Sequence, residues 1–560
     1  MISKEPLSFR INNIINDEKV REINFNLSDF ECGKFVKLNN YFCGLIDDDI
    51  FIYDDICDHA SGKLNLVSEC QAKCPIHGWS IDLASGVYSN GCKKEKIEYV
   101  KKNNIVTILE KFQVFPCIDT AGLTSKKIDF YFNSHASVTV NIGNISLTTD
   151  PWLIGPACAG GWWHSYIPDN NALKRLAKSN IIYISHNHSD HLHLETLLTA
   201  VDKDALIIIP NYESRSVESL LLENGYKNLL VIDFMKEVEV SSGSEKLKLI
   251  IVKSGDERDD SSLLIFTKDK KICFAVDTNR PNNWILPSCD ILFSPFASGA
   301  SCFPSCIDNF SDDEKIAIST KNKKTFLANH VKKLIDSTSP TYIVPYAGYF
   351  QEIGRDKYIK SVNIKNTIKD LSDFLSISYP NTLLINPTIN NFFSLDNDLE
   401  LSSVYKKPLY VLDEEYISRY LKDESKFVLT KSYLNKIGDE LISSKFYDDL
   451  TVVLFFCDEI FESVDDLCIS IDFSIKNRGY KILMTHDLEH LNGVMVDKTG
   501  NNYEFIKIRS GVFMKEAAKG FSLEDFTSGW NMRVFRYPNV YNFKFYNYFT
   551  DIHKIKVDVN

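Results

Sequence analysis

The stretch NIIYISHNHSDHLHLETL, residues 180–197, decides how the central part of this chain folds. A short apolar run, typical of a buried strand, leads directly into the pattern His-x-His-x-Asp-His, which comprises His186, His188, Asp190 and His191. Two imidazoles at positions i and i+2, followed by a carboxylate and a third imidazole on the next turn, can surround one or two cations. The stretch therefore predicts a metal site at the end of a buried strand.

Strand-like and helix-like segments alternate on both sides of this metal motif. The strand patterns VTVNIG and ISLTTDP precede it, and further apolar runs follow as far as TYIVPY at residues 341–346, with amphipathic stretches between several of them. Such alternation is typical of a layered α/β domain. After about residue 400 the pattern is less regular, and strands such as TVVLFF and LCISIDFSI indicate an α+β region.

A second set of ligand residues lies near the amino terminus, among short strand-like runs typical of a small all-β module. Cys57 and His59 form a Cys-x-His pair, and Cys74 and His77 form a Cys-x-x-His pair. Two thiolates and two imidazoles can hold either zinc or a [2Fe-2S] cluster in which two histidines replace two cysteines on one iron. The run CPIHGW and the pattern W-x-x-D-x-x-x-G resemble Rieske domains, whereas a zinc knuckle gives no reason for them. We therefore expect a Rieske cluster on these four residues.

The metal motif and the strand end TTDPWL before it resemble the metallo-β-lactamase fold, an αββα sandwich. That resemblance implies a bridging carboxylate after a later strand, where Asp277 stands in KICFAVDTNRP, and a further histidine between the motif and this carboxylate. Only His193 occurs there, so Asp256 in SGDERDDSS is the expected substitute ligand, with Asp260 behind it. Asp150 is expected to orient a ligand or the motif loop. Because fewer imidazoles and more carboxylates favour iron, we expect non-haem iron, mono- or dinuclear, with zinc as an alternative.

The two sites together predict an O2-dependent monooxygenase, because a cluster that delivers single electrons has no use in plain hydrolysis. The ordered runs DPWLIGPACAGGWW, YISHNHSDHL, DTNRP, FASGASCFP, PYAGYF and SGWNMRVFRYPNVYNF, after the Rieske module, resemble the CMP-N-acetylneuraminate hydroxylase family over nearly the whole chain. The resemblance implies hydroxylation of the N-acetyl group of a CMP-sialic acid to N-glycolyl. It also implies electrons from a soluble donor such as cytochrome b5, or a ferredoxin with its NAD(P)H reductase.

Two other functions are compatible with the same residues. One is a Rieske-fused oxygenase that acts on another amide or nucleotide-linked substrate, and the other is a metallo-β-lactamase-fold hydrolase whose Rieske module senses redox state. Arg280 could meet a phosphate or carboxylate of the substrate, or form a structural salt bridge. Trp162 and Trp163 could line the pocket or fill the core. His486 and His490 have helical spacing that mimics an iron site, but a capped surface turn explains them.

Length and composition limit the remaining possibilities. At 560 residues the chain has room for several domains, which we place at 1–115 (Rieske), 116–400 (metal-binding sandwich) and 401–560 (α+β). Lys and Arg number 63 against 75 Asp and Glu, and this net charge of −12 without like-charge blocks argues against nucleic acid as a partner. No apolar run is long enough for a membrane span. We expect a cytoplasmic protein with a small-molecule substrate, and homo-oligomerisation is possible.

Overall fold

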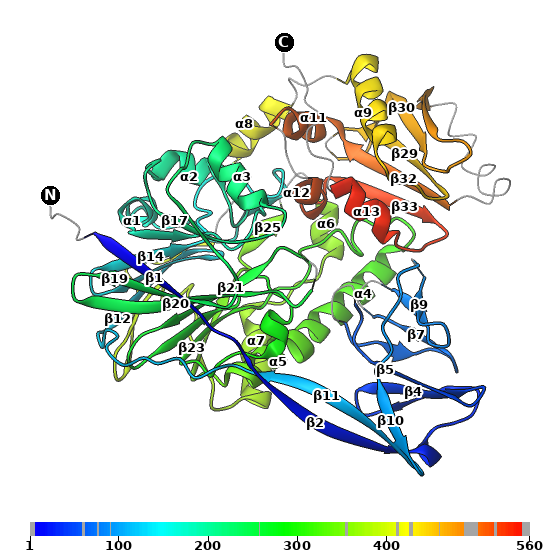
Figure 1. Cartoon of the computed structure of the whole chain (residues 1–560). Coiled ribbons are helices and arrows are strands. Elements are labelled where there is room, and N and C mark those ends of the chain that lie inside the picture. The colour runs from blue at the N-terminus through cyan, green and yellow to red at the C-terminus, as the bar shows by residue number, and fades with distance from the viewer. Residues whose placement is uncertain are drawn as a thin grey trace.

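The computed structural model describes residues 6–550, apart from 59–61, 76–77, 90, 257, 353–356, 410–413, 425–428, 459, 486–501 and 520–522. The described chain forms a central two-sheet sandwich, a small β module near the amino terminus and a C-terminal α+β region (Figure 1). This architecture confirms the predicted fold class. Among the described residues, no helix combines the length and apolar character needed to cross a membrane.

Two eight-stranded sheets form the sandwich. The first sheet has the order β1 (Leu7–Asn13), β19 (Lys236–Ser242), β20 (Glu245–Lys253), β21 (Ser261–Phe266), β22 (Lys271–Phe274), β23 (Ile291–Pro295), β24 (Tyr342–Tyr346) and β26 (Leu383–Leu384). The second has the order β18 (Leu229–Ile232), β17 (Ile207–Pro210), β16 (Ile181–Tyr183), β14 (Ile145–Thr149), β13 (Ser137–Ile142), β12 (Ile128–Ser134), β27 (Phe392–Leu395) and β28 (Leu399–Ser402). Strands β22, β23, β24 and β26 are parallel, as are β14, β16, β17 and β18.

Helices cover both outer faces of the sandwich (Figure 1). The helices packed on the second sheet are α1 (Ala172–Lys178), α2 (Leu194–Ala200) and α3 (Ser216–Glu223). On the first sheet lie α5 (Lys332–Thr338), which continues α4 (Asp312–Thr325) through the π-helical turn η3 (Phe326–Val331), and α7 (Ile368–Ser378). The central strands are buried on both faces and are therefore rich in apolar residues, and every residue of β21 and β23 is buried.

Stacked aromatic rings fill the space between the two sheets. The ring centroids of Phe274 and Phe293 lie 4.2 Å apart, and those of Phe130 and Phe393 lie 4.8 Å apart. All four rings belong to one continuous buried core that draws residues from both sheets. This packing fixes the sheets relative to each other, and so fixes the strand ends that carry the metal motif.

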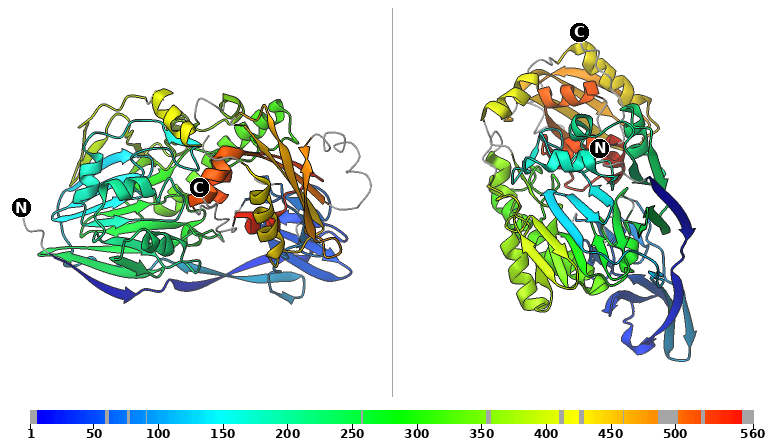
Figure 2. Two further views of the ribbon diagram at one scale, coloured as in Figure 1. Left: turned by 90° about the horizontal axis from the view of Figure 1, so that it is seen from above. Right: turned by 90° about the vertical axis from the view of Figure 1, so that its left-hand side faces the viewer.

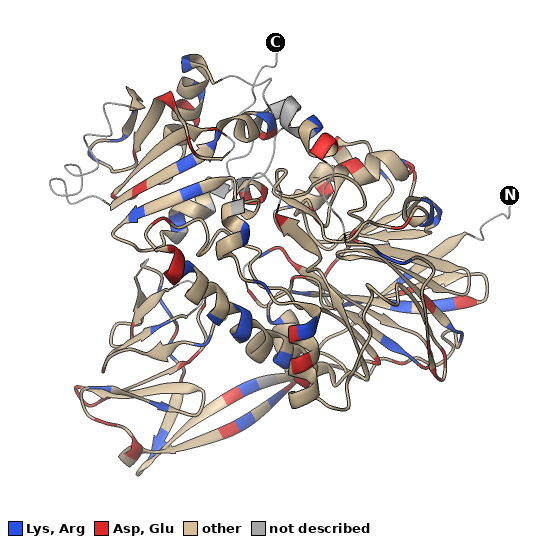
Figure 3. Cartoon of the chain, turned by 180° about the vertical axis from the view of Figure 1, so that it is seen from behind, with Lys and Arg blue, Asp and Glu red and all other residues tan. Residues whose placement is uncertain are grey.

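The amino-terminal module consists of three small antiparallel sheets. Their strands are β2 (Asp17–Asn26), β10 (Tyr99–Lys102) and β11 (Ile105–Val114); β3 (Phe35–Leu38), β4 (Tyr41–Ile46) and β5 (Asp49–Asp54); and β6 (Asn65–Leu66), β7 (Gln71–Lys73), β8 (Ser80–Asp82) and β9 (Val87–Tyr88). Acidic and basic residues are interspersed along the β2–β11 ribbon (Figure 3). One ion pair on this ribbon joins Arg21 and Glu110. The first strand, β1, lies within the range predicted for this module, but it pairs with β19 as the edge strand of the sandwich.

A five-stranded sheet organises the C-terminal region. Its order is β31 (Gly479–Met484), β30 (Val464–Asp472), β29 (Leu450–Cys457), β32 (Asn502–Arg509) and β33 (Met532–Tyr537). The accompanying helices are α8 (Glu414–Glu424), α9 (Lys431–Ser443), α11 (Ser510–Lys519), α12 (Leu523–Ser528) and α13 (Phe543–Thr550). The region lies against both other parts of the chain (Figures 1 and 2): Val534 forms a bridge with Ile307 of the sandwich, and Tyr541 packs on the core of the amino-terminal module.

Candidate metal centre

Strand ends from three separate stretches meet at one edge of the second sheet. Strands β12 and β14 both pair antiparallel with β13, so they run in the same direction, and β16 is parallel to β14. His135 follows β12, Asp150 follows β14, and the metal motif follows β16. Side chains distant in sequence therefore converge at the carboxyl ends of these strands.

The loop that carries the motif is held at both ends. Asp150 accepts hydrogen bonds from the Ser185 backbone N–H at 2.7 Å (Oδ1) and from Ser185 Oγ at 2.8 Å (Oδ2). At the other end of the loop, His193 caps helix α2 because its Nδ1 accepts a hydrogen bond from the Thr196 N–H at 3.2 Å. These contacts order the four predicted ligands that lie between them.

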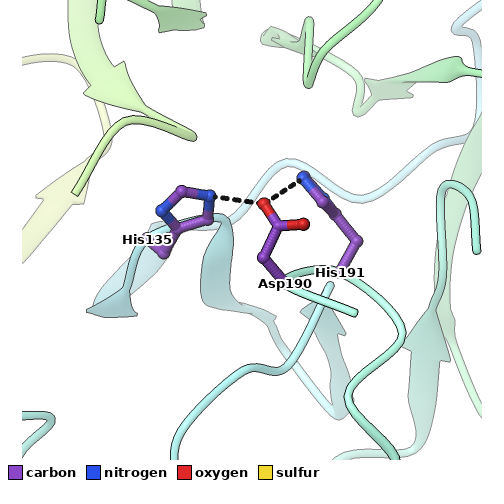
Figure 4. Close-up of side chains that lie close together, drawn as sticks. All are labelled: His135, Asp190 and His191. Carbon is purple, nitrogen blue, oxygen red and sulfur yellow. Dashed lines mark hydrogen bonds and ion pairs between the residues drawn. The ribbon is translucent and has the colours of Figure 1, made fainter. Parts of the chain in front are cut away.

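His135, Asp190 and His191 form one group of possible metal ligands (Figure 4). Asp190 Oδ2 lies 3.1 Å from His135 Nε2 and 3.2 Å from His191 Nε2. On its other side, His191 Nδ1 lies 3.0 Å from Asp150 Oδ2. His191 Nε2 is buried without a hydrogen-bond partner among the described residues, although Asp277 Oδ2 is also within 3.4 Å. The Nδ1 atom of His191 thus faces one carboxylate and its Nε2 atom faces two others. This arrangement is typical of a histidine that binds a metal through one nitrogen and is oriented by a carboxylate at the other.

Two further groups extend this one. His186, His191 and Asp277 form the second, and His186, His188 and Asp260 form the third. In the third group His186 Nε2 lies 2.8 Å from His188 Nδ1 and 3.5 Å from Asp260 Oδ1. Because the groups share His186 and His191, the cluster is continuous and offers ligands for one or two cations. The cluster contains all five predicted ligands, namely the four residues of the motif and Asp277.

Burial and neighbouring charges set the protonation of these groups. Burial lowers the pKa of His186 well below its ordinary value, so its imidazole is neutral, as metal ligation requires. Burial also opposes protonation of His191, but the charges of Asp190 and Asp277 outweigh it and raise the pKa of His191 well above the ordinary value. Burial raises the pKa of Asp260 to about 6. So many carboxylates buried beside imidazoles fit a site built for a cation.

Asp260, and not Asp256, is the carboxylate that faces His186. Asp256 accepts hydrogen bonds from Ser254 Oγ at 2.8 Å and from Arg258 Nε at 3.0 Å, and it is in none of the three groups found among the described residues. Arg258 also reaches Asp260, with Nη1 to Oδ2 at 2.9 Å. The guanidinium therefore lies between the two carboxylates and links Asp256 to the centre indirectly.

The predicted substrate residues have different surroundings. Trp162 is buried and stacks on Phe350 with a centroid distance of 3.8 Å, and its ring lies 6.3 Å from that of His135. Trp163 is also buried, and its Nε1 donates to the Gly160 carbonyl at 3.2 Å. Arg280 Nε is buried without a hydrogen-bond partner in the described part of the chain. Trp162 is thus part of an aromatic wall beside the metal cluster, and Arg280 retains a donor for a ligand.

The two cysteines of the amino-terminal motif are buried in the core of their module. Their backbones form tight loops: Cys57 N–H donates to the Gly62 carbonyl and Cys74 N–H to the Trp79 carbonyl, both at 2.7 Å. Gly78 has a φ of +78°, a conformation that favours glycine and lets its N–H donate to the Cys74 carbonyl at 3.0 Å. The partner histidines, His59 and His77, and also His486 and His490, lie outside the described residues.

Comparison with known proteins agrees with these features. The family model described as the Rieske [2Fe-2S] domain matches residues 32–103. The cytidine monophosphate-N-acetylneuraminic acid hydroxylase of Danio rerio is 29% identical over 497 residues, which cover 85% of this chain and 82% of the relative. The same hydroxylase of Macaca mulatta is 28% identical over 526 residues, with 88% and 86% covered. The chain is similar to these hydroxylases. The similarity extends over most of the length of both chains.

Two of the matching solved structures each align with about half of this chain. CmlA, a diiron beta-hydroxylase from Streptomyces venezuelae, is 15% identical with a TM-score of 0.32, and the match covers 49% of this chain and 54% of that one. The metallo-beta-lactamase fold protein YhfI from Bacillus subtilis is 11% identical with a TM-score of 0.29, covering 46% and 95%.

Sequence analysis missed two sets of residues at the candidate metal cluster. His135 had a detectable signal in the sequence, because it directly follows the strand-like run IDFYFNS, as Asp150 directly follows the run ISLTT. Glu524 and Asp525 of α12 reach the motif loop from the C-terminal region: Glu524 pairs with His188, and Asp525 accepts a hydrogen bond from the Ser189 N–H. No local sequence pattern predicts that α12 contacts the motif loop, because the two segments lie more than three hundred residues apart in the chain.

Proposed function

We propose that this chain is an O2-dependent monooxygenase that hydroxylates the N-acetyl group of CMP-N-acetylneuraminate to give CMP-N-glycolylneuraminate. The observation that carries the proposal is the similarity to the named hydroxylases, which extends over 85–88% of the chain. The Rieske domain at residues 32–103 supports a redox reaction over hydrolysis. The alternative of a redox-sensing hydrolase is therefore not favoured.

The reaction consumes one O2, two electrons and two protons for each substrate molecule. A C–H bond of the acetyl methyl group breaks, one oxygen atom forms the new C–OH group, and the other leaves as water. Bound non-haem iron would supply O2 activation, and the [2Fe-2S] cluster would supply electrons one at a time. The electrons come from a reducing partner, for which we propose a soluble donor such as cytochrome b5, or a ferredoxin with its NAD(P)H reductase, in the cytoplasm.

Different residues of the chain would bind the iron, exclude water and bind the substrate. The iron would be held by the motif residues and Asp277, to which the geometry adds His135 and Asp260, while Asp150 orients His191. The aromatic wall of Trp162 and Phe350 excludes water beside His135. Arg280, whose buried Nε has no hydrogen-bond partner among the described residues, would bind the phosphate or carboxylate of the nucleotide sugar.

Turnover with labelled oxygen tests this function. The iron-loaded protein, a reduced donor, ¹⁸O2 and CMP-N-acetylneuraminate should give a product with one labelled oxygen in the glycolyl group, detected by mass spectrometry. The same mixture without O2 should give none. A fully reduced, iron-loaded protein that forms no hydroxylated product from this substrate would exclude it, and a comparison of other amide and nucleotide-linked substrates would then follow.

A further inference from the structure

The segment around α12 of the C-terminal region is inserted tightly against the metal loop. Asp525 Oδ1 accepts the Ser189 N–H at 3.1 Å, and Ser189 Oγ in turn accepts the Cys158 N–H at 2.7 Å. Two glycines let the backbones meet, because a Cβ on Gly529 would lie 1.9 Å from the Cys158 carbonyl oxygen and a Cβ on Gly161 would lie 2.1 Å from that of Gly529. The position of α12 relative to the metal loop is therefore fixed by backbone packing.

This docking places Glu524 against His188. Glu524 Oε1 lies 3.0 Å from His188 Nε2, while the other ring nitrogen, Nδ1, lies 2.8 Å from His186 Nε2 inside the cluster. The ring of His188 thus has an inner nitrogen that faces the cluster and an outer nitrogen that faces a carboxylate. Such a carboxylate fixes the tautomer and orientation of a ligating histidine and increases its basicity as a ligand.

The other two histidines of the motif have polar partners within the sandwich, a carboxylate for His191 and a hydroxyl for His186. Asp150 Oδ2 contacts the outer nitrogen of His191 at 3.0 Å, and Ser185 Oγ contacts Nδ1 of His186 at 2.9 Å. His188 is the member whose outer partner comes from another region of the chain. All three histidines therefore have an outer partner only when the C-terminal region is packed against the sandwich.

We propose that Glu524 is a positioning residue of the metal centre, and that the C-terminal region is an essential part of this centre. The proposal rests on the metal-binding role of His188 in the proposed function. Asp525 and the glycine contact hold α12 in place, and Glu524 holds the His188 ring with Nδ1 toward the cluster. The C-terminal region, to which the sequence assigned no role, thereby completes a site that is otherwise built from the sandwich.

Cobalt binding tests the role of Glu524 without reliance on turnover. The full-length protein with its oxidised Rieske cluster, which is EPR-silent, is freed of metal at the second site and dialysed against Co²⁺. Glu524→Gln should weaken Co²⁺ binding by about 10–100-fold. It should also change the EPR spectrum of the bound Co²⁺. Glu440→Gln, a substitution at an exposed position of α9, should do neither.

The thermal midpoint of the cobalt-free protein separates positioning from folding. We expect Glu524→Gln and the wild type to unfold at similar temperatures when the site is empty of Co²⁺. Unchanged Co²⁺ affinity and spectrum in Glu524→Gln would overturn the proposal, even if hydroxylation is demonstrated. Weakened binding in a protein that does not hydroxylate the sugar nucleotide would overturn only the proposed function. A wild-type protein that takes up no Co²⁺, or an equal loss of stability in the cobalt-free variant, would also overturn the role of Glu524.

Discussion

Asp150 Oδ2 and His191 Nδ1 lie 3.0 Å apart, and both side chains are completely buried. The same carboxylate accepts two hydrogen bonds from Ser185 at the start of the metal loop. One residue therefore contacts a predicted ligand and also the start of the loop that carries the other predicted ligands. The sequence predicts that Asp150 orients a ligand or the motif loop, and these contacts are compatible with that prediction.

Asp150→Asn should weaken metal binding by about 10–100-fold, because an amide replaces the charged partner of His191. Equilibrium dialysis with elemental analysis measures the affinity. Asp373→Asn, on the exposed face of α7, serves as the control and should bind metal normally. Normal metal affinity in Asp150→Asn would mean that His191 does not depend on this carboxylate.

His135→Ala should lower the metal content of the sandwich and the rate of product formation, because Asp190 loses a contact at 3.1 Å and the cluster loses an imidazole. The EPR signal of the reduced Rieske cluster should keep its shape and intensity, since His135 belongs to another domain. If His135→Ala keeps the full metal content and the full rate, the role of His135 is limited to packing in the core. Its ring centroid lies 5.2 Å from that of Trp152.

A contiguous motif allowed the grouping of the motif side chains to be predicted from the sequence, and tertiary pairing explains which neighbours were missed. His186, His188, Asp190 and His191 share one short loop, so their proximity is local. Which of Asp256 and Asp260 faces the cluster depends on the position of the Arg258 side chain, and the spacing of residues in the sequence does not specify that position.

Long-range contacts account for the other differences. The first strand, β1, belongs to the sandwich only because it pairs with β19, more than two hundred residues later. Glu524 reaches His188 because Gly161 and Gly529 allow two backbones to approach closely. Such contacts depend on the packing of whole domains, and periodicity along the chain carries no signal for them.

Cys74→Ser should remove the Rieske cluster while the sandwich keeps its metal. Cys74 is buried in the core of the amino-terminal module, and serine is a poor substitute for a thiolate ligand. We expect loss of acid-labile sulfide and of the reduced-cluster EPR signal, together with loss of donor-dependent hydroxylation. Cys32→Ser, at an exposed cysteine, is the control. Persistence of the cluster signal in Cys74→Ser would exclude this cysteine as a ligand.

The stability of the C-terminal region should fall as the pH rises from about 4.5 toward 8. Burial raises the pKa of Glu504 from 4.5 to about 8, against the opposing effects of Arg536 and of a hydrogen bond from Tyr546. A carboxyl group whose pKa is higher in the folded state binds its proton more tightly there, so its contribution is full below pH 4.5 and is lost through pH 8. Thermal midpoints measured across this range should decline.

Glu504→Gln is the matched variant for this pH effect. Glutamine has a similar shape and no titration, so the decline attributable to this position should disappear, while other groups keep their contributions. The midpoint of the variant should therefore exceed that of the wild type most clearly near pH 8. Parallel pH profiles for the two proteins would contradict the assignment.

Gly529→Ala should separate the C-terminal region from the metal loop. The added Cβ would lie 1.9 Å from the Cys158 carbonyl oxygen, and because both atoms belong to packed backbones, the segments must move apart. Overpacking of this kind costs about 1–3 kcal/mol of stability. Gly479→Ala is the control, because its Cβ would meet only the Asn477 carbonyl oxygen at 3.8 Å, an ordinary contact.

Since Glu524 lies five residues before Gly529, displacement of this segment by Gly529→Ala should also weaken metal binding. Chemical denaturation and metal dialysis on the same samples measure both effects. A Gly529→Ala protein that loses stability but binds metal like the wild type would show that docking of α12 and order at His188 are independent.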